Sequence, residues 1–148
     1  MRLSLQKAAH AGFDAVACRT SGYYRYGPMS PPSHSSTAED LYHEGLDRLA
    51  EGDAAGAAQK LRHCLELDPG MLDAMHGLIR ALQEQGELDA AIAVAQRLLQ
   101  LDPDEVLAHT SLSILYQHKG MIAEAEAEAL QAKLLGWKKH LQQQKPKA

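Results

Sequence analysis

Eight histidines are the side chains of this sequence that are best suited to hold a metal ion, because imidazole nitrogens are common metal ligands. His43, His76 and His109 recur at a spacing that is one position shorter than the period of the surrounding sequence. Each of these histidines therefore lies one position earlier in its repeat than the one before it. One position on a helix is a rotation of about 100°, so the three rings point in different directions. We predict no metal site and no cofactor.

Residues 123–130, AEAEAEAL, look like a cluster of carboxylates for acid–base catalysis. On a helix, however, Glu124 and Glu128 share one solvated face and Glu126 lies on another. Cys18 and Cys64 have no metal-ligand spacing, and Cys64 falls on the apolar face of a helical segment, where we expect it to pack as an inert side chain. No phosphate-binding glycine loop, HExxH motif or nucleophile elbow occurs. We predict that the chain is not an enzyme.

Charge is unevenly distributed along the 148 residues. Residues 1–37 hold four basic side chains and one acidic one, residues 38–135 hold seven basic and 18 acidic ones, and residues 136–148 hold four lysines. An acidic central segment repels phosphate, so we predict that the folded part binds no nucleic acid. Aromatic residues make up only 5% of the chain, and Ala, Leu, Gln and Glu are abundant. This composition is typical of an all-α protein.

Residues 1–37 are predicted to be a disordered, basic N-terminal extension that ends in a linker. Residues 27–37, GPMSPPSHSST, contain three prolines and five hydroxyl side chains, which disfavour a helix. Lys7 and Asp14 interrupt the apolar stretch that a secretory signal needs, but a transit peptide within residues 1–28 stays an alternative. Met29 lies in the linker, so we expect residues 1–28 to be dispensable. No segment is apolar enough to span a bilayer, and we predict a cytoplasmic protein.

From residue 38 onward the apolar residues follow a helical period. Ser36 and Glu39 have the spacing of a capping box, with Thr37 as an overlapping cap, and they predict a helix that begins near Ala38. Pairs of amphipathic helices joined by a glycine turn then recur three times. The fixed marks of this repeat are Gly52, Gly86 and Gly120 in the turns, Ala57, Ala91 and Ala125 where we expect two helices to touch, and Pro69 and Pro103 after the first two hairpins. Marks that recur at one constant period indicate a stack of helical hairpins.

The joints between these hairpins are near-copies of each other, LELDPG from Leu65 and LQLDPD from Leu99. Proline cannot continue a helix, so each Asp-Pro pair is predicted to end one hairpin and to start the next. We expect the leucines before each joint, including Leu67 and Leu101, to pack at the ends of buried helices.

The pattern resembles the tetratricopeptide repeat family, in which W-x2-L-G-x2-Y, then A-x3-F, then P recur with a period of about 34 residues. The resemblance covers about residues 38–137 and rests on Leu41, Gly45, Ala57, Leu61 and Pro69 in the first copy, on Met75, Leu78, Ile79, Leu82, Ala91, Ala95 and Pro103 in the second, and on His109, Leu112, Ser113, Tyr116, Ala125 and Ala129 in the third. It implies an all-α, right-handed α-solenoid of three hairpins. The repeats would span about residues 38–71, 72–105 and 106–137, followed by a basic tail at 138–148.

Departures from the family pattern occur at both ends of this array. In the first copy Glu44 and Arg48 replace apolar residues, and their four-residue spacing predicts an ion pair on one helical face. In the third copy Trp137 stands at the position of the proline, which lets the last helix continue. We predict that Trp137 and Leu141 form a short capping segment over the last hairpin.

The resemblance also implies a binding site, because the first helices of such hairpins line a concave groove that holds a peptide or a helix of another protein. By helix register the lining residues are Tyr42, Leu46, Leu49, Asp73, His76, Arg80, Gln83, Leu107, Thr110, Ile114 and Gln117. Arg80 is the one fixed cation among them, and the groove is mostly apolar because of Tyr42, Leu46, Leu49, Leu107 and Ile114. We predict a protein–protein interaction module, a small adaptor or scaffold that binds an apolar or amphipathic segment of a partner protein.

An alternative function from the same residues is self-association. In that case the groove would be filled by another copy of the chain, which would make the protein a homo-oligomer, or by its own residues 1–28.

Overall fold

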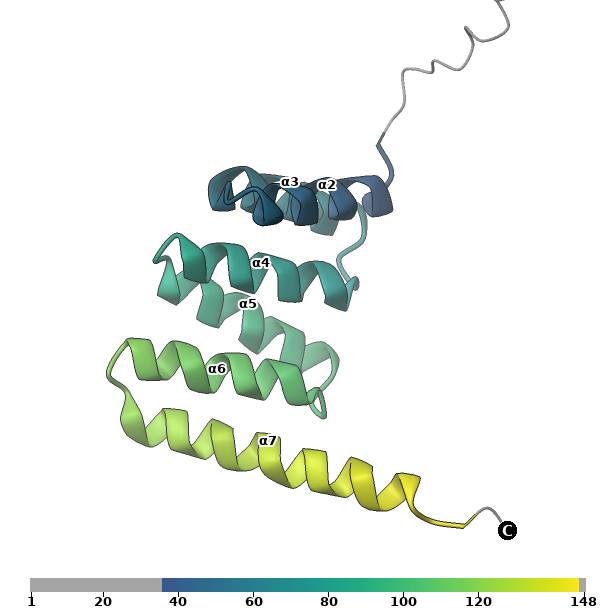
Figure 1. Cartoon of the computed structure of the whole chain (residues 1–148), viewed down its shortest axis with the longest axis vertical. Helices are drawn as coiled ribbons and strands as arrows, with labels where there is room; N and C mark the ends of the chain where they lie inside the picture. The colour runs from purple at the N-terminus through teal and green to yellow at the C-terminus, as the bar shows by residue number, and fades with distance from the viewer. Residues whose placement is uncertain (1–35, 147–148) are drawn as a thin grey trace, which may run out of the picture. The chain divides into compact units, whose positions relative to one another are not determined.

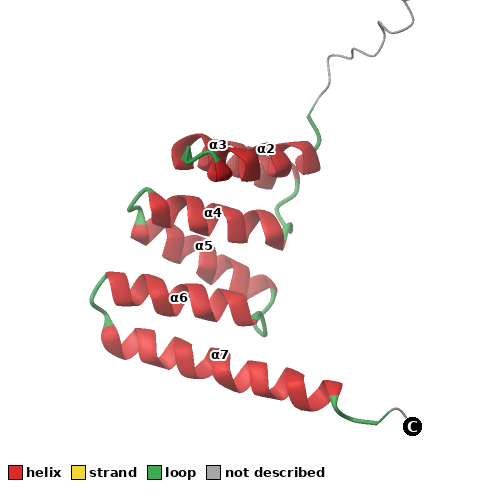
Figure 2. Ribbon diagram, in the orientation of Figure 1, coloured by secondary structure: helices red, strands yellow, loops and turns green. Residues whose placement is uncertain are grey.

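The structure is a computed structural model and describes residues 36–146. Within this range the chain forms the helices α2 (Ala38–Ala50), α3 (Ala54–Leu67), α4 (Leu72–Glu84), α5 (Leu88–Leu101), α6 (Val106–His118) and α7 (Ile122–Gln143), joined by short turns (Figures 1 and 2). Each helix packs against the next one in the chain, so the described residues are an all-α solenoid of three stacked hairpins, as predicted. The predicted extension, the Met29 start and the transit peptide lie outside the described residues.

The first helix begins at Ala38, where the sequence predicted it. Its capping box lies one residue later than the predicted pair of Ser36 and Glu39. Thr37 is the N-cap: its hydroxyl accepts a hydrogen bond from the amide of Asp40 at 3.1 Å, and the Asp40 carboxylate accepts one from the amide of Thr37 at 3.0 Å. This reciprocal pair satisfies two amide donors that the helix cannot bond itself. Ser36 and Glu39 lie one position too early to reach the same groups.

The turn inside each hairpin depends on a glycine in the left-handed region. Gly52, Gly86 and Gly120 have φ angles of 88°, 81° and 79°. In each turn the amide of the residue after the glycine donates to a carbonyl five residues earlier, as from Asp53 to Arg48 at 2.8 Å. This Schellman arrangement satisfies carbonyls at the end of the first helix, and only glycine adopts the required backbone without strain. The three glycines therefore set the reversal of the chain in every hairpin.

The Asp-Pro joints between hairpins use the aspartate side chain to form the turn. Asp68 Oδ1 accepts a hydrogen bond from the amide of Gly70 at 3.2 Å, and Asp102 Oδ1 accepts one from the amide of Asp104 at 3.1 Å. These bonds favour a turn over another helical residue, and the intervening proline has no amide to extend the helix. Leu67 and Leu101, expected to be packed at these joints, are each 52% exposed.

Ion pairs at the first hairpin differ from the predicted one. Glu44 pairs with Lys60 of α3 at 2.6 Å, and Arg48 pairs with Asp53 at 2.9 Å, so Glu44 and Arg48 have different partners. Asp53 is the N-cap of α3, and its carboxylate also accepts a hydrogen bond from the amide of Gly56 at 2.9 Å. The Gly56 amide and the Arg48 guanidinium hold the pKa of Asp53 below its usual value.

One hydrophobic core extends from α2 to α6. Leu61 of α3 packs closely on both α2 and α4: a Cβ atom on Gly45 of α2 would lie 2.7 Å from Leu61 Cγ, and one on Gly77 of α4 would lie 3.1 Å from Leu61 Cδ1. The missing side chains of these glycines leave the space that Leu61 fills. The alanines expected at points of contact, Ala57, Ala91 and Ala125, are fully buried.

The last helix is longer than the others and continues through Trp137 to Gln143. Leu135 is buried, whereas Trp137 is 69% exposed and Leu141 is 60% exposed. The helix thus extends as the sequence predicted, but Trp137 and Leu141 do not cover the last hairpin. No helix within residues 36–146 has the length and apolar character needed to cross a lipid bilayer.

The first helices of the hairpins lie on the inner side of the stack. Helix α2 contacts α4 and α4 contacts α6, whereas no contact in the described residues joins α3 to α5 or α5 to α7. Since the first helices are nearer to one another than the second helices are, the stack curves with α2, α4 and α6 on its concave side. We call the side of these three helices that faces away from the second helices the inner surface.

Candidate functional site

All eleven residues predicted to line a groove belong to α2, α4 and α6, at equivalent positions in the three hairpins. They are Tyr42, Leu46 and Leu49 on α2, Asp73, His76, Arg80 and Gln83 on α4, and Leu107, Thr110, Ile114 and Gln117 on α6. Their chemistry changes from helix to helix, which divides the inner surface into three zones.

The zone on α2 is apolar and largely packed. Tyr42 and Leu46 are half-buried against the core, and Leu46 Cδ2 would lie 3.7 Å from a Cβ atom on Gly77 of α4. Leu49 is only 8% exposed and belongs to the core itself. Tyr42 and Leu46 can present one edge to a ligand, whereas Leu49 contributes to stability.

The zone on α4 is polar. Arg80 is mostly exposed, and its Nε donates to Glu84 Oε1 at 3.1 Å, so the fixed cation of the predicted groove already has an anionic neighbour on its own helix. Asp73 is exposed, and His76 and Gln83 are half-buried. This zone can make hydrogen bonds with a ligand but offers little net positive charge.

The zone on α6 displays apolar side chains to solvent. Leu107 is 60% exposed and Ile114 is 39% exposed, and seven positions separate them, which is about 10.5 Å along the helix axis. Between them, the Thr110 hydroxyl donates to the carbonyl of Val106 at 2.9 Å, so it is satisfied within α6. Exposed Leu and Ile side chains two turns apart are suited to contact an apolar ligand.

A polar contact that the sequence did not reveal joins the last two helices. His109 is 9% exposed; its Nδ1 lies 2.6 Å from Glu128 Oε2 and its Nε2 lies 3.1 Å from the carbonyl of Pro103. Both ring nitrogens thus lie within hydrogen-bond distance of an acceptor oxygen. The Ser113 hydroxyl also donates to the carbonyl of Ala125 at 2.8 Å. These buried bonds fix α7 on α6. The distance in sequence between His109 and Glu128 matches no known motif, so no sequence signal marks this pair.

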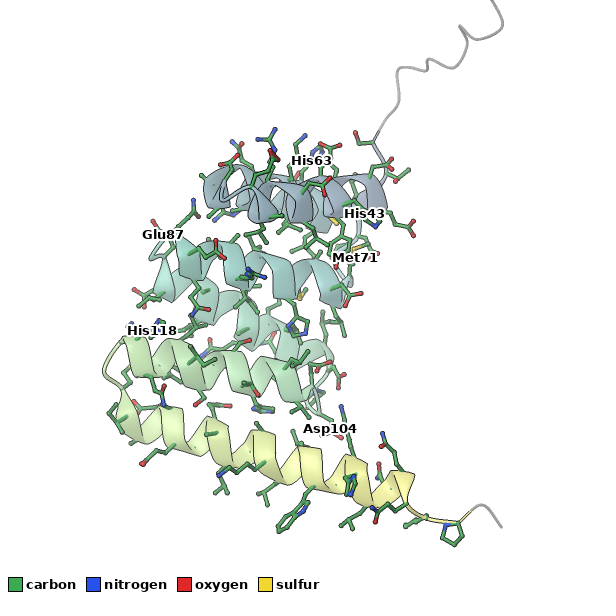
Figure 3. The ribbon with its side chains drawn as sticks, viewed as in Figure 1. His43, His63, Met71, Glu87, Asp104 and His118 are labelled. Atoms are coloured by element: carbon green, nitrogen blue, oxygen red, sulfur yellow. The ribbon has the colours of Figure 1, made fainter. Side chains whose placement is uncertain are left out.

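Within residues 36–146, no three His, Cys, Asp or Glu side chains come together in a way that could hold a metal ion. Figure 3 shows His43 and His63 on the first hairpin and His118 at the end of α6, away from both. Cys64 is buried, and its Sγ lies 3.6 Å from the Met71 sulfur. Burial raises the pKa of this thiol, and the Asp68 carboxylate raises it further, so the reactive thiolate is disfavoured. Cys18 lies outside the described residues.

The outer side of the stack has a hollow among α3, α4 and α5, lined by Arg62, Leu65, Glu66, Leu78 and Arg97. Two leucines give it an apolar floor, with two arginines and one glutamate around it, and it lies on a different side from the inner surface.

Comparison with known proteins identifies the repeat. Residues 48–112, from the last turn of α2 to the middle of α6, match the sequence profile of the family described as tetratricopeptide repeat. The chain is a tetratricopeptide repeat protein. The matched range includes the whole second hairpin, where the sequence pattern was also most complete.

Solved structures share the fold of this tetratricopeptide repeat protein. MamA is 24% identical, with 72% of this chain and 63% of the MamA chain covered and a TM-score of 0.69. The type III secretion translocator chaperone SycD of Yersinia enterocolitica is 25% identical, with 69% and 77% of the two chains covered and a TM-score of 0.65. The second tetratricopeptide repeat domain of Spaghetti (RPAP3), bound to the HSP90 peptide SRMEEVD, is 16% identical, with coverage of 67% and 92% and a TM-score of 0.64.

Among curated proteins, a pentatricopeptide repeat-containing protein of Arabidopsis thaliana is 27% identical over 146 residues, covering 88% of this chain and 20% of that protein. The chain thus spans about a fifth of the length of this relative and less than two-thirds of the MamA chain. At these identities the likeness to MamA and to the Spaghetti domain is one of fold.

Proposed function

We propose that this protein is an interaction module that binds an apolar or amphipathic segment of a partner protein on its inner surface. The observation on which the proposal depends is the exposure of Leu107 and Ile114 on the inner side of α6. Their spacing of two helical turns matches apolar residues seven apart on a bound amphipathic helix. The apolar edges of Tyr42 and Leu46 on α2 extend the same surface.

Two proteins with this fold support peptide binding in general. The Spaghetti domain was solved with an HSP90 peptide, and SycD was solved in complex with a peptide of the translocator YopD. The HSP90 peptide, SRMEEVD, contains three acidic residues. On the inner surface proposed here Arg80 is already paired with Glu84, so a ligand rich in carboxylates would find little compensating charge. This difference favours an apolar or amphipathic ligand over an acidic tail.

The proposal is tested by selecting a displayed library of random peptides on the immobilised full-length chain. We expect the enriched peptides to have apolar residues at amphipathic spacing. Replacing Leu107 and Ile114 together by Asp should reduce the affinity of a selected peptide at least tenfold, because two apolar contacts are lost from the surface.

Leu101→Asp is the matched control, because Leu101 is about as exposed as Leu107 but belongs to a second helix. This variant should bind the selected peptides normally. If the variant with Asp at both Leu107 and Ile114 binds as tightly as Leu101→Asp, the proposed site is wrong. It is also wrong if the selected peptides are acidic and lack apolar residues.

A further inference from the structure

A second apolar surface lies on α7, away from the inner surface. Leu130, Leu134, Trp137 and Leu141 are between 49% and 69% exposed, and we call these four residues the α7 stripe. Leu134 follows the buried Ala125 by nine positions, or two and a half turns. It therefore lies on the side of α7 opposite to the side that packs on α6. The stripe is a face of the last helix that nothing in residues 36–146 covers.

The other second helices have no such stripe. At the positions of Leu130 and Leu134, one and two repeats earlier, α5 has Gln96 and Gln100 and α3 has Arg62 and Glu66, and all four side chains are exposed. The repeat pattern therefore does not require leucine at these positions. A solvent-facing helix surface that changes from polar to apolar at the end of a stack indicates a contact with another surface.

The spacing along the stripe is that of a helix–helix seam. Its residues are separated by four, three and four positions, which is the heptad pattern in which one helix packs along another. Helix α7 is also the longest in the stack, with 22 residues, so a partner helix can pack along several turns.

Charge along α7 favours a partner of the same sequence in the opposite direction. Glu124 and Glu126 lie in the first turns, whereas Lys133, Lys138 and Lys145 lie in the second half or just beyond the helix end, Lys138 with a 3.5 Å contact to Asp104. Two parallel copies would place acidic ends side by side. Two antiparallel copies place the acidic end of each helix beside the basic end of the other.

We propose that the α7 stripe is the interface of an antiparallel homodimer, in which α7 of one copy packs along α7 of a second copy. Placing Leu134 opposite Trp137 of the other copy also places Leu130 opposite Leu141 of the other copy, so the stripe is complementary to itself. The same alignment brings Glu124 near Lys145 of the other copy. Such a two-fold contact is closed and leaves no free half to bind a third chain.

The first test is sedimentation equilibrium of the full-length protein over a range of concentrations. We expect a monomer–dimer equilibrium that Leu134→Glu shifts to monomer at every concentration, with an unchanged far-ultraviolet circular dichroism spectrum. Gln100→Glu adds the same charge at the same position one repeat earlier and should leave the dimer intact. A wild-type protein that is monomeric throughout, or a dimer that survives Leu134→Glu, would overturn the proposal.

The second test asks whether the two α7 helices of the dimer run antiparallel. At low salt, Glu124→Lys alone and Lys145→Glu alone should each weaken the dimer about five- to tenfold, because each breaks two symmetric ion pairs. The double variant should recover the affinity of the wild type. If the double variant stays as weak as the single variants, the antiparallel alignment is wrong.

The remaining occupant to test is a membrane surface, since tryptophan and lysines on an amphipathic helix also suit one. The probe is co-sedimentation of the full-length protein with vesicles of phosphatidylcholine and phosphatidylserine. Binding to these vesicles that depends on Trp137, together with a monomeric protein in solution, would replace the dimer by a membrane contact. Absence of vesicle binding together with a dimer supports the proposal.

Discussion

Helices α5 and α7 occupy the same place in successive hairpins, yet their surfaces are nearly reversed. In α5, Ile92 and Leu98 are buried, because α4 packs on one side of this helix and α6 of the next hairpin packs on another. The residues one repeat later in α7 are Glu126, which is exposed, and Ala132, which is half-buried. On the outer side the polarity is reversed: α5 has polar glutamines there, and α7 has the apolar stripe. The neighbours of a helix, rather than its place in the repeat, determine which of its faces is apolar.

The largest expected difference in the free energy of unfolding is between truncating a leucine of α5 and truncating a leucine of α7. Leu98→Ala empties a fully buried site and should lower the free energy of unfolding by about 2 to 5 kcal/mol. Leu134→Ala, measured by urea denaturation at low protein concentration, should change it by less than about 0.5 kcal/mol, because the side chain is exposed. Equal losses at the two sites would show that α7 is packed on both faces.

Overpacking should be the next largest effect. Ala91 is fully buried at the contact of α5 with its neighbours, and Ala91→Leu should cost about 1 to 3 kcal/mol of unfolding free energy. Ala93→Leu makes the same change on the exposed side of α5 and serves as the control, with a change within about 0.5 kcal/mol. An unchanged melting temperature for Ala91→Leu would mean that the helices do not touch at this alanine.

A smaller effect is expected where α7 is fixed on α6. Glu128→Gln keeps the shape of the side chain but removes the charge that faces His109 Nδ1, which should cost about 1 to 2 kcal/mol at neutral pH. Glu126→Gln removes the same charge from an exposed position of α7 and should have little effect. Thermal unfolding of the two variants gives the comparison. If Glu126→Gln is as harmful as Glu128→Gln, the loss comes from net charge and not from the contact with His109.

The smallest effect concerns the start of the second helices. Asp53 caps α3 with its side chain, whereas the N-caps of α5 and α7, Glu87 and Met121, make no such bond. Asp53→Ala should therefore lower stability more than Glu87→Ala does. Because the folded state lowers the pKa of Asp53, its contribution is present at neutral pH and is lost as the pH falls through that lowered value. Urea denaturation at pH 7 and at about pH 3 should show the difference between these variants shrinking in acid.

Much of the fold was predictable because it depends on local chemistry. A turn in the left-handed region favours glycine, and proline stops a helix because it has no backbone N–H to donate. Gly52, Gly86 and Gly120 together with the Asp-Pro pairs therefore show where the chain reverses. The start of α2 at Ala38 follows from a capping hydroxyl just before it. These signals act within a few residues and are visible in any single copy of the repeat.

Contacts between helices were harder to predict, because periodicity does not show which of several neighbours a side chain reaches. Glu44 could pair with Arg48 on its own helix, but Lys60 comes within reach once α3 folds back along α2. His109 reaches Glu128 for a similar reason, with the hairpin turn between them. Burial of Trp137 failed as a prediction because a terminal helix has a neighbour on only one side.

The site was predicted by register, and register places residues on a helix without giving their exposure. The eleven predicted positions all belong to α2, α4 and α6. Leu49 and Gln117 occupy equivalent positions of α2 and α6, yet Leu49 lies in the core and Gln117 is exposed. The residues suited to meet a ligand are therefore fewer than the pattern implies.

Contacts in residues 36–146 occur only between helices that are adjacent in the stack or are successive first helices, and this has a consequence for the order in which the protein opens. No contact ties the first hairpin directly to the last one, so each can open while the rest of the array stays folded. Amide hydrogen exchange should be slowest in α4 and α5, which have neighbours on both sides. It should become progressively faster toward the final turns of α7. Within a single folded domain, the protein should behave as a short series of coupled units rather than as one all-or-none body.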